Sequence, residues 1–407
     1  MGCSSSNIVT KSNDNIDEQN QKEENASQGK NQSQISKKDL KLSSLYKSFG
    51  FTYQLLQNSN LLLYTNYLNT NCEFTSIVEN QKEKNEKLSF KSSNHSIAIG
   101  YRKGYKLEFV NQDKFFVFLN GPIEAYCVID GHGPFGNKVA QICQDVLFEY
   151  VLNLDKEKFE NNYTNSLNEI YEKVNKKIIN REEKTYGNYD PFLSGVAVTL
   201  IIRIKSMIYC SNVGNVLAII FNSDTLMPSK FNITELTFND SNFNEDILNY
   251  ENNSEQDSQN LNDSIIDNLI NPNEINFEIR RIYENGGEMR KLLGETKSRI
   301  FVKGKYFPGL INTRSLGDQI GKGIGILSSP HITTFKLSKS INYFLLICSD
   351  GINNVMNISR LVAILQENEQ LLLESVSSIL GESKASYRTH SYTPDMTIVI
   401  KELKVSE

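Results

Sequence analysis

Two short apolar runs in this sequence end on an aspartate that is followed directly by glycine. Ala125–Ile129 leads into Asp130, and Tyr343–Ser349 leads into Asp350. Short runs rich in β-branched and aromatic residues are typical of buried strands. A carboxylate at the end of such a strand is costly to bury unless it is paired or holds a cation. The fold must therefore place these strand ends where acidic side chains meet a positively charged partner.

Elsewhere in the chain, strand patterns alternate with helix patterns. The strand patterns are Phe115–Leu119, Val196–Ile204, Met207–Gly214, Leu217–Phe221 and Met396–Leu403. Apolar residues recur at helical spacing in Asn137–Asn153, Asn165–Glu183 and Ile358–Leu380, and we expect the last stretch to be broken midway. The link after Ile204 is short enough for a hairpin, which favours antiparallel pairing. The combination predicts an α+β domain built from packed layers.

Composition divides the 407 residues into a folded part and polar appendages. Residues 1–38 are almost free of bulky apolar side chains and are predicted to be a disordered tether. Residues 39–94 form an N-terminal extension without an assignment, and the folded domain is expected to span 95–407. Within it, the acidic, Asn-rich stretch at about 240–271 is predicted to be a disordered insertion. The net charge of −5 without a basic stripe argues against nucleic acid as a partner.

The first six residues, MGCSSS, predict lipid attachment. Removal of Met1 would expose Gly2 for myristoylation, with Ser6 at the place that the pattern requires, and Cys3 offers a second acylation site. One acyl chain binds a membrane weakly, whereas two bind it stably. The six cysteines are scattered, which indicates reduced thiols rather than disulfides or a zinc site. We therefore expect a cytoplasmic monomer that is attached to the cytoplasmic face of a membrane.

Four aspartates flank the predicted strands. Asp113 and Asp395 each precede a strand, whereas Asp130 and Asp350 each follow one. Oxygen ligands on rigid elements are what a hard divalent cation requires. Two such cations would activate a water molecule and bind a phosphoryl group. A single Asp-Gly pair is more typical of an ordinary turn, so the interpretation depends on all four aspartates together.

With these segments in place, the sequence resembles the metal-dependent protein phosphatases (PPM type, also called type 2C serine/threonine phosphatases). The matching segments include DGHGPFG, TRSLGD and SDG, and they span about Ile99–Leu403 apart from the acidic insertion. The resemblance implies a four-layer α/β/β/α sandwich with two antiparallel sheets. It also implies two ions, Mg²⁺ or Mn²⁺, in a cleft at one end, and phosphoserine or phosphothreonine proteins as substrates.

The resemblance further implies roles for individual residues. Asp130 looks like the carboxylate that bridges both metal ions, the Gly131 carbonyl like a ligand of the second ion, and Asp350 like a ligand of the first. Asp113 fills the acidic place in the family's first motif. His132 is the candidate general acid for the leaving oxygen, and a structural turn histidine is the alternative.

Other residues are candidates for supporting roles. The family uses a basic residue near its first motif to hold the phosphate, and Arg102, Lys103 and Lys106 are available there. A guanidinium fork suits phosphate best, which favours Arg102. Asp318, in TRSLGD, is expected to support the site or to brace the cleft. Gln112 stands where many members of the family have glutamate.

Some positions depart from the family pattern. In TPDMT, Pro394 occupies the place of a metal-binding aspartate, so either Asp395 takes over that role or the first metal loses a ligand. Asn215 and Asn354 stand where the family commonly has aspartates that serve a third, weaker metal. An amide is a poorer cation ligand than a carboxylate, which makes a third metal doubtful.

Two hypotheses from different classes therefore stand. The first is a membrane-tethered serine/threonine phosphatase that uses Mg²⁺ or Mn²⁺. The second is a catalytically impaired pseudophosphatase, which keeps the fold as a phosphoprotein-binding or regulatory module. The neutral residues at three usually acidic places favour the second, whereas the retained acidic residues and His132 favour the first.

Overall fold

The structure is a computed structural model that describes residues 61–65, 86–92, 95–105, 110–181, 186–223, 231–241, 272–293, 295, 297–390 and 392–405. All described residues belong to one compact unit of the chain, which lies within Phe49–Glu407. The predicted tether with Gly2 and Cys3, and residues 242–271 of the predicted insertion, lie outside the described residues. No helix in the described part of the chain combines the length and apolar character needed to cross a membrane.

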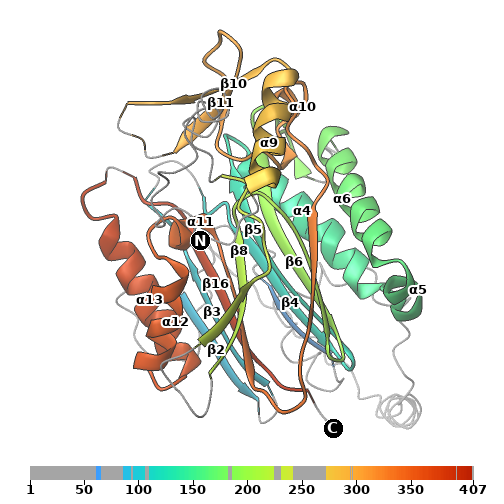
Figure 1. Cartoon of the computed structure of the whole chain (residues 1–407), viewed down its shortest axis with the longest axis vertical. Coiled ribbons are helices and arrows are strands. Elements are labelled where there is room, and N and C mark those ends of the chain that lie inside the picture. The colour runs from blue at the N-terminus through green and yellow to red at the C-terminus, as the bar shows by residue number, and fades with distance from the viewer. Residues whose placement is uncertain are drawn as a thin grey trace, which may run out of the picture. The chain divides into compact units, whose positions relative to one another are not determined.

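Seven of the described strands form one antiparallel sheet (Figure 1). At the centre of this sheet, β5 pairs with β6 over ten residues, from Ile123 opposite Ile204 to His132 opposite Gly195. The sheet order is β1 (Leu61–Thr65), β4 (Lys114–Asn120), β5 (Ile123–His132), β6 (Gly195–Ile204), β7 (Met207–Val213) and β14 (His331–Lys336), with β13 (Leu316–Gly317) also beside β6.

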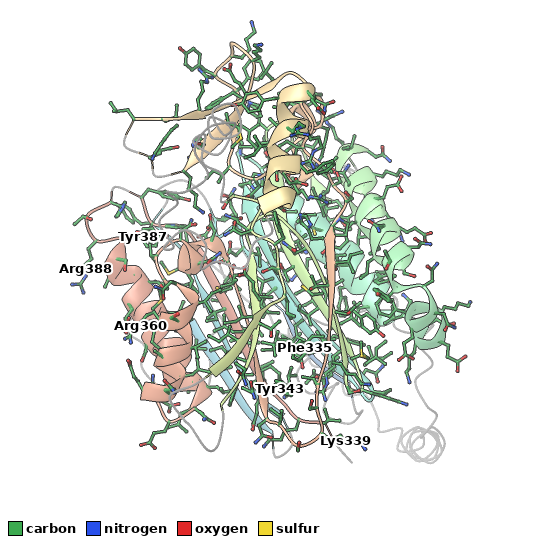
Figure 2. All side chains as sticks on the ribbon, in the orientation of Figure 1. Phe335, Lys339, Tyr343, Arg360, Tyr387 and Arg388 are labelled. Carbon is green, nitrogen blue, oxygen red and sulfur yellow. The ribbon has the colours of Figure 1, made fainter. Side chains whose placement is uncertain are left out.

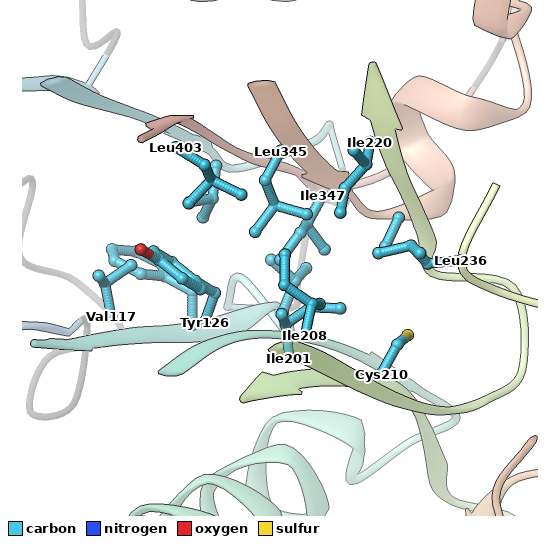
Figure 3. Close-up of a cluster of buried hydrophobic side chains, with 14 of the residues drawn as sticks. Val117, Tyr126, Ile201, Ile208, Cys210, Ile220, Leu236, Leu345, Ile347 and Leu403 are labelled. Atoms are coloured by element: carbon cyan, nitrogen blue, oxygen red, sulfur yellow. The ribbon is translucent and has the colours of Figure 1, made fainter. Parts of the chain in front are cut away.

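A second antiparallel sheet packs against the first. Its order is β2 (Glu86–Ser92), β3 (His95–Arg102), β16 (Met396–Leu403), β15 (Tyr343–Cys348), β8 (Leu217–Ser223) and β9 (Phe231–Glu235). Alternate side chains of both sheets meet in one buried cluster, where Val117 and Ile201 of the first sheet face Leu345 and Leu403 of the second (Figure 3). At the edge, the Phe335 ring of β14 contacts the Tyr343 ring of β15, with centroids 5.6 Å apart (Figure 2).

Helices cover the outer face of each sheet (Figure 1). On the first sheet lie α4 (Gly136–Leu152), α5 (Lys156–Asn161) and α6 (Tyr163–Ile179), and the Phe148 ring of α4 packs on Phe116 of β4. On the second lie α11 (Asp350–Asn353), α12 (Ile358–Glu367) and α13 (Leu372–Ser386). The contacts order the layers as helices, sheet, sheet, helices. The predicted α+β class with antiparallel sheets is confirmed.

The predicted long helix at 358–380 is broken, as expected. The Asn357 side chain caps α12 by accepting a hydrogen bond from the Arg360 backbone N–H at 2.8 Å. The helix ends before Glu369 and Gln370, which both have positive φ angles of 51° and 61°. A left-handed conformation at two successive residues cannot continue a right-handed helix, so α13 starts anew.

A small three-stranded sheet was not predicted. It consists of β10 (Gly287–Lys291), β11 (Ser298–Val302) and β12 (Pro308–Leu310), and it packs with α9 (Pro272–Glu284) and α10 (Gln319–Lys322) around a core of its own. Glu278 of α9, only 1% exposed, binds Arg281 of the same helix and Arg314 of the main body. Burial disfavours the Glu278 carboxylate, but the two arginines outweigh burial and lower its pKa to about 2.

Several predicted boundaries differ from the structure. Strand β5 continues two residues beyond Asp130, because Gly131 and His132 still pair with β6. Asp240 and Ser241, which composition assigned to the insertion, are buried, and the Asp240 carboxylate accepts the Gly214 N–H at 2.6 Å. Strands β1 and β2 come from the extension 39–94. Strand β1 pairs with β4 in the first sheet and β2 pairs with β3 in the second, so the fold begins before residue 95.

Candidate active site

The two strand-ending aspartates meet although they belong to different sheets. Asp130 lies near the end of β5, and Asp350 is the first residue of α11, directly after β15 and Ser349. The backbone N–H of Asp350 donates to Oδ2 of Asp130 at 3.3 Å. The two carboxylates therefore share one edge of the sandwich, as the sequence predicts.

Asp113 lies behind this pair as a buried, hydrogen-bonded carboxylate. Its Oδ2 accepts the Ser349 hydroxyl at 2.8 Å and the Thr397 hydroxyl at 2.7 Å. The Ser349 oxygen in turn accepts the Thr397 backbone N–H at 2.9 Å. Asp113 thus ties the start of β4 to the end of β15 and the start of β16, and its predicted role as a metal ligand stays a prediction.

Asp395 is engaged in a similar way. Its Oδ1 accepts the Gly104 N–H at 2.7 Å and its Oδ2 the Gln112 N–H at 2.9 Å. A Cβ on Gly104 would lie 2.1 Å from the Thr393 carbonyl oxygen, so only glycine allows this close approach. The carboxylate holds two backbone segments beside Pro394, and its predicted role as a metal ligand stays a prediction.

Gln112 braces the turn that follows Asp130. Its Nε2 donates to the Gly133 carbonyl at 2.8 Å, which a glutamate in its ionised form could not do. A Cβ on Gly131 would lie 2.7 Å from the Gln112 carbonyl oxygen and 2.6 Å from that of Gly136. The residue that departs from the family pattern therefore has a defined task in shaping the DGHGPFG turn.

His132 is held by a buried aspartate. Its Nε2 lies 2.7 Å from Oδ2 of Asp318, which is fully buried, whereas the histidine side chain is 31% exposed. Asp318 itself has a positive φ of 44°, and a Cβ on Gly195 would lie 2.2 Å from its Oδ2. The absence of a side chain at Gly195 thus makes room for the carboxylate.

The charges of this pair reinforce one another. Burial acts to lower the pKa of His132, but the Asp318 carboxylate outweighs burial, and with Asp350 it raises the pKa above its ordinary value. Burial acts to raise the pKa of Asp318, and the His132 imidazolium outweighs it, so this pKa falls. Burial also lowers the pKa of Lys322, near Asp318, to about 7. The pair favours a protonated histidine beside Asp350.

Arg102 ends β3 at the same edge. It is partly buried and pairs in the sheet with Met396, the residue after Asp395. Lys103 is exposed, and Lys106 lies outside the described residues. The predicted role of Arg102 in phosphate binding stays a prediction.

Two asparagine side chains donate hydrogen bonds to the Asp350 carboxylate. Its Oδ2 accepts Nδ2 of Asn215 at 3.4 Å and Nδ2 of Asn354 at 3.3 Å. The Asn354 oxygen accepts Nζ of Lys297 at 2.9 Å. Sequence reasoning missed Lys297, because an isolated lysine between two strands has no distinctive pattern. Burial lowers its pKa, while the Asp350 carboxylate acts to raise it.

The residues on the Asp130 side of Asp350 fit a divalent cation better than those on the Asn215 and Asn354 side. The Asp130 carboxylate lies against the backbone of Asp350, and both residues supply the oxygen chemistry that Mg²⁺ and Mn²⁺ prefer. Among the described residues, no group of three or more His, Cys, Asp or Glu side chains is arranged to hold a metal ion. On the far side of Asp350, the amides of Asn215 and Asn354 and the Lys297 ammonium do not fit a further cation.

Comparisons with known proteins agree with this architecture. The chain is 24% identical to probable protein phosphatase 2C 1 of Arabidopsis thaliana over 287 residues, or 63% of this chain and 54% of that protein. It therefore spans about half the length of that relative. It is also 24% identical to probable protein phosphatase 2C 35 of the same plant over 301 residues, or 72% of this chain and 79% of that protein.

Solved structures show the same fold at low sequence identity. Serine-threonine phosphatase 2C from Toxoplasma gondii has a TM-score of 0.54 at 14% identity, covering 78% of this chain and 97% of its own. A C. elegans sex determining protein has a TM-score of 0.52 at 18% identity, covering 78% of this chain and 67% of its own. The family model described as protein phosphatase 2C matches residues 105–246 and 272–391, more than half of the chain. The chain therefore belongs to the protein phosphatase 2C family.

Proposed function

We propose that this protein hydrolyses phosphoserine and phosphothreonine in phosphoproteins, with Mg²⁺ or Mn²⁺ as the activating ion. The observation that supports this best is the meeting of Asp130 and Asp350 from two different sheets. A histidine fixed by the fully buried Asp318 lies at the same edge. An acidic pair beside a proton donor is the set of groups that phosphate ester hydrolysis requires.

Asp130 and Asp350, with the Gly131 carbonyl, would hold the cation. When bound, the cation supplies a water of lowered pKa as nucleophile and neutralises charge on the phosphate. The family resemblance implies a second ion, and Asp130 would help to hold both. The Arg102 guanidinium, at the end of β3, would bind phosphate oxygens and orient the ester.

His132 would protonate the leaving oxygen of the serine or threonine. Its Nε2 is bonded to Asp318, so Nδ1 is the nitrogen left to carry a proton to the substrate. The Asp318 carboxylate orients the ring and stabilises the imidazolium form, which is the form that can donate. An alkoxide is a poor leaving group, so this proton is needed for the physiological esters.

A specific observation favours the second candidate function, a phosphoprotein-binding pseudophosphatase. Pro394 has no side-chain oxygen, and both carboxylate oxygens of Asp395 already accept backbone N–H groups. In this proposal Asp395 serves the backbone rather than the first ion, which would then lack a ligand that the family supplies. In this case the cleft would bind a phosphorylated partner without hydrolysing it.

The two functions differ in a direct assay of the full chain. We expect Mn²⁺-dependent hydrolysis of a phosphothreonine peptide and of p-nitrophenyl phosphate, and its loss in Asp130→Asn. Asp155→Asn is the matched control, since Asp155 caps α5 and pairs with Lys158 on the surface, and asparagine caps a helix equally well. If wild type, Asp130→Asn and control are equally inert, catalysis is ruled out, and retained binding of the phosphopeptide would favour the pseudophosphatase.

A further inference from the structure

Lys297 reaches the candidate active site from a separate part of the fold. It lies immediately before β11, in the connection from β10, within the small sheet that was not predicted. Its Nζ donates to the Asn354 oxygen at 2.9 Å and to the Ser241 hydroxyl oxygen at 2.8 Å. The Ser241 hydroxyl donates in turn to the Asn239 oxygen at 2.8 Å, so the acceptor that faces the lysine is oriented.

The amide of Asn354 transmits this contact to Asp350. Its oxygen accepts from Lys297, and its Nδ2 donates to Asp350 Oδ2 at 3.3 Å. An aspartate in this place could accept from the lysine but could not donate to Asp350. The second amide is arranged likewise, since Asn215 donates to Asp350 while its oxygen accepts Nδ2 of Asn312 at 3.1 Å.

The charges of this cluster are balanced without an added ion. One carboxylate, Asp350, and one ammonium, Lys297, are joined by the neutral amide of Asn354, and the neutral amide of Asn215 also donates to Asp350. Three carboxylates at the places of Asp350, Asn215 and Asn354 would repel one another and would require a cation between them. With the lysine and the amides present, a divalent cation on that side would meet a positive charge and only one anionic ligand.

We infer that Lys297 is a built-in cation that takes the place of a metal ion on the Asn215 and Asn354 side of Asp350, and that it positions Asp350 through Asn354. The inference rests on the proposed function only in treating Asp350 as a metal ligand. It makes Lys297 a positioning residue, and it confines divalent cations to the side of Asp350 that faces Asp130.

Titration of the full chain with Mn²⁺ tests the inference without an activity measurement. Three proteins are compared by calorimetry: wild type, N215D/N354D, and N215D/N354D/K297M. We expect the double variant to bind as many Mn²⁺ ions as wild type, because the Lys297 ammonium occupies the side of Asp350 on which a further ion would bind. We expect the triple variant to bind one more ion. An extra ion in the double variant, or none in the triple variant, overturns the inference.

A second measurement keeps the test valid if the triple variant unfolds. N354D is introduced into wild type and into K297M, and the melting temperature is recorded with a chelator present. We expect N354D to lower the melting temperature by at least about 2 °C more in the K297M background, where the new carboxylate faces Asp350 alone. Equal shifts in both backgrounds contradict the inference. Hydrolysis by wild type separately decides the proposed function.

Discussion

Replacing Asp318 by asparagine should impair hydrolysis in a way that depends on the leaving group. The change removes the carboxylate charge but keeps the size of the side chain, 2.7 Å from Nε2 of His132. Without that charge, the imidazolium of His132 is less stable and less well oriented. The proton that His132 gives to the leaving oxygen then becomes harder to supply.

The structure sets the size of the effect. A hydrogen bond between a charged donor and a charged acceptor contributes about 1.5–3 kcal/mol, and full burial of Asp318 favours the upper part of that range. This corresponds to a fall of about 10- to 150-fold in kcat for a phosphothreonine peptide. Hydrolysis of p-nitrophenyl phosphate should fall less than about threefold, because nitrophenolate leaves without a proton.

The assay measures kcat for both substrates in wild type, Asp318→Asn, His132→Gln and the double variant. Because Asp318 acts through His132, the double variant should be no slower than His132→Gln alone. Gly195→Ala provides an independent perturbation, since its Cβ would lie 2.2 Å from Oδ2 of Asp318 and must displace the carboxylate. It should reproduce the dependence on the leaving group.

Two results would refute this reasoning. One is an equal loss of activity on both substrates, which would mean that Asp318 supports the site as a whole rather than the proton donor. The other is a further loss in the double variant beyond His132→Gln. Melting temperatures of all variants separate these outcomes from a general loss of folded protein.

Three further predictions concern stability and are tested by urea unfolding. Glu278→Gln should cost about 3 kcal/mol at pH 7, from the difference between the ordinary pKa of 4.5 and the folded value of about 2. Because the folded pKa is depressed, this stabilisation is present above pH 4.5 and is lost as the pH falls toward 2. The difference in unfolding free energy between wild type and Glu278→Gln should therefore be smaller by about 2 kcal/mol at pH 3 than at pH 7. A difference that does not change with pH would contradict the prediction. Gly104→Ala should cost about 1–3 kcal/mol, because its Cβ would lie 2.1 Å from the Thr393 carbonyl oxygen, and an unchanged midpoint would disprove that contact. Thr397→Val should cost about 1–3 kcal/mol by removing a hydroxyl from the buried Asp113 carboxylate, and a cost near zero would show that this hydrogen bond contributes little.

Local patterns were sufficient to predict much of the candidate site. Apolar runs that end on Asp130 and Asp350 mark strand ends, and strand ends gather at sheet edges, so their meeting could be expected before the structure. The small sheet at 287–310 was missed because its strands are only three to five residues long, too short for a distinct pattern. The buried Asp240 was assigned to the insertion because the residues that follow it are acidic and polar.

The sequence by itself determined the α+β class, the order of the main strands and helices, and the identity of the acidic pair, because each follows from periodicity or from neighbouring residues. Only the tertiary structure decided what the other polar groups do. Asp395 meets the backbone of Gly104 and Gln112, and Lys297 meets Asn354, across large separations in the chain. Such contacts are selected by how the layers pack, and that packing depends on the whole buried core rather than on any local run of residues.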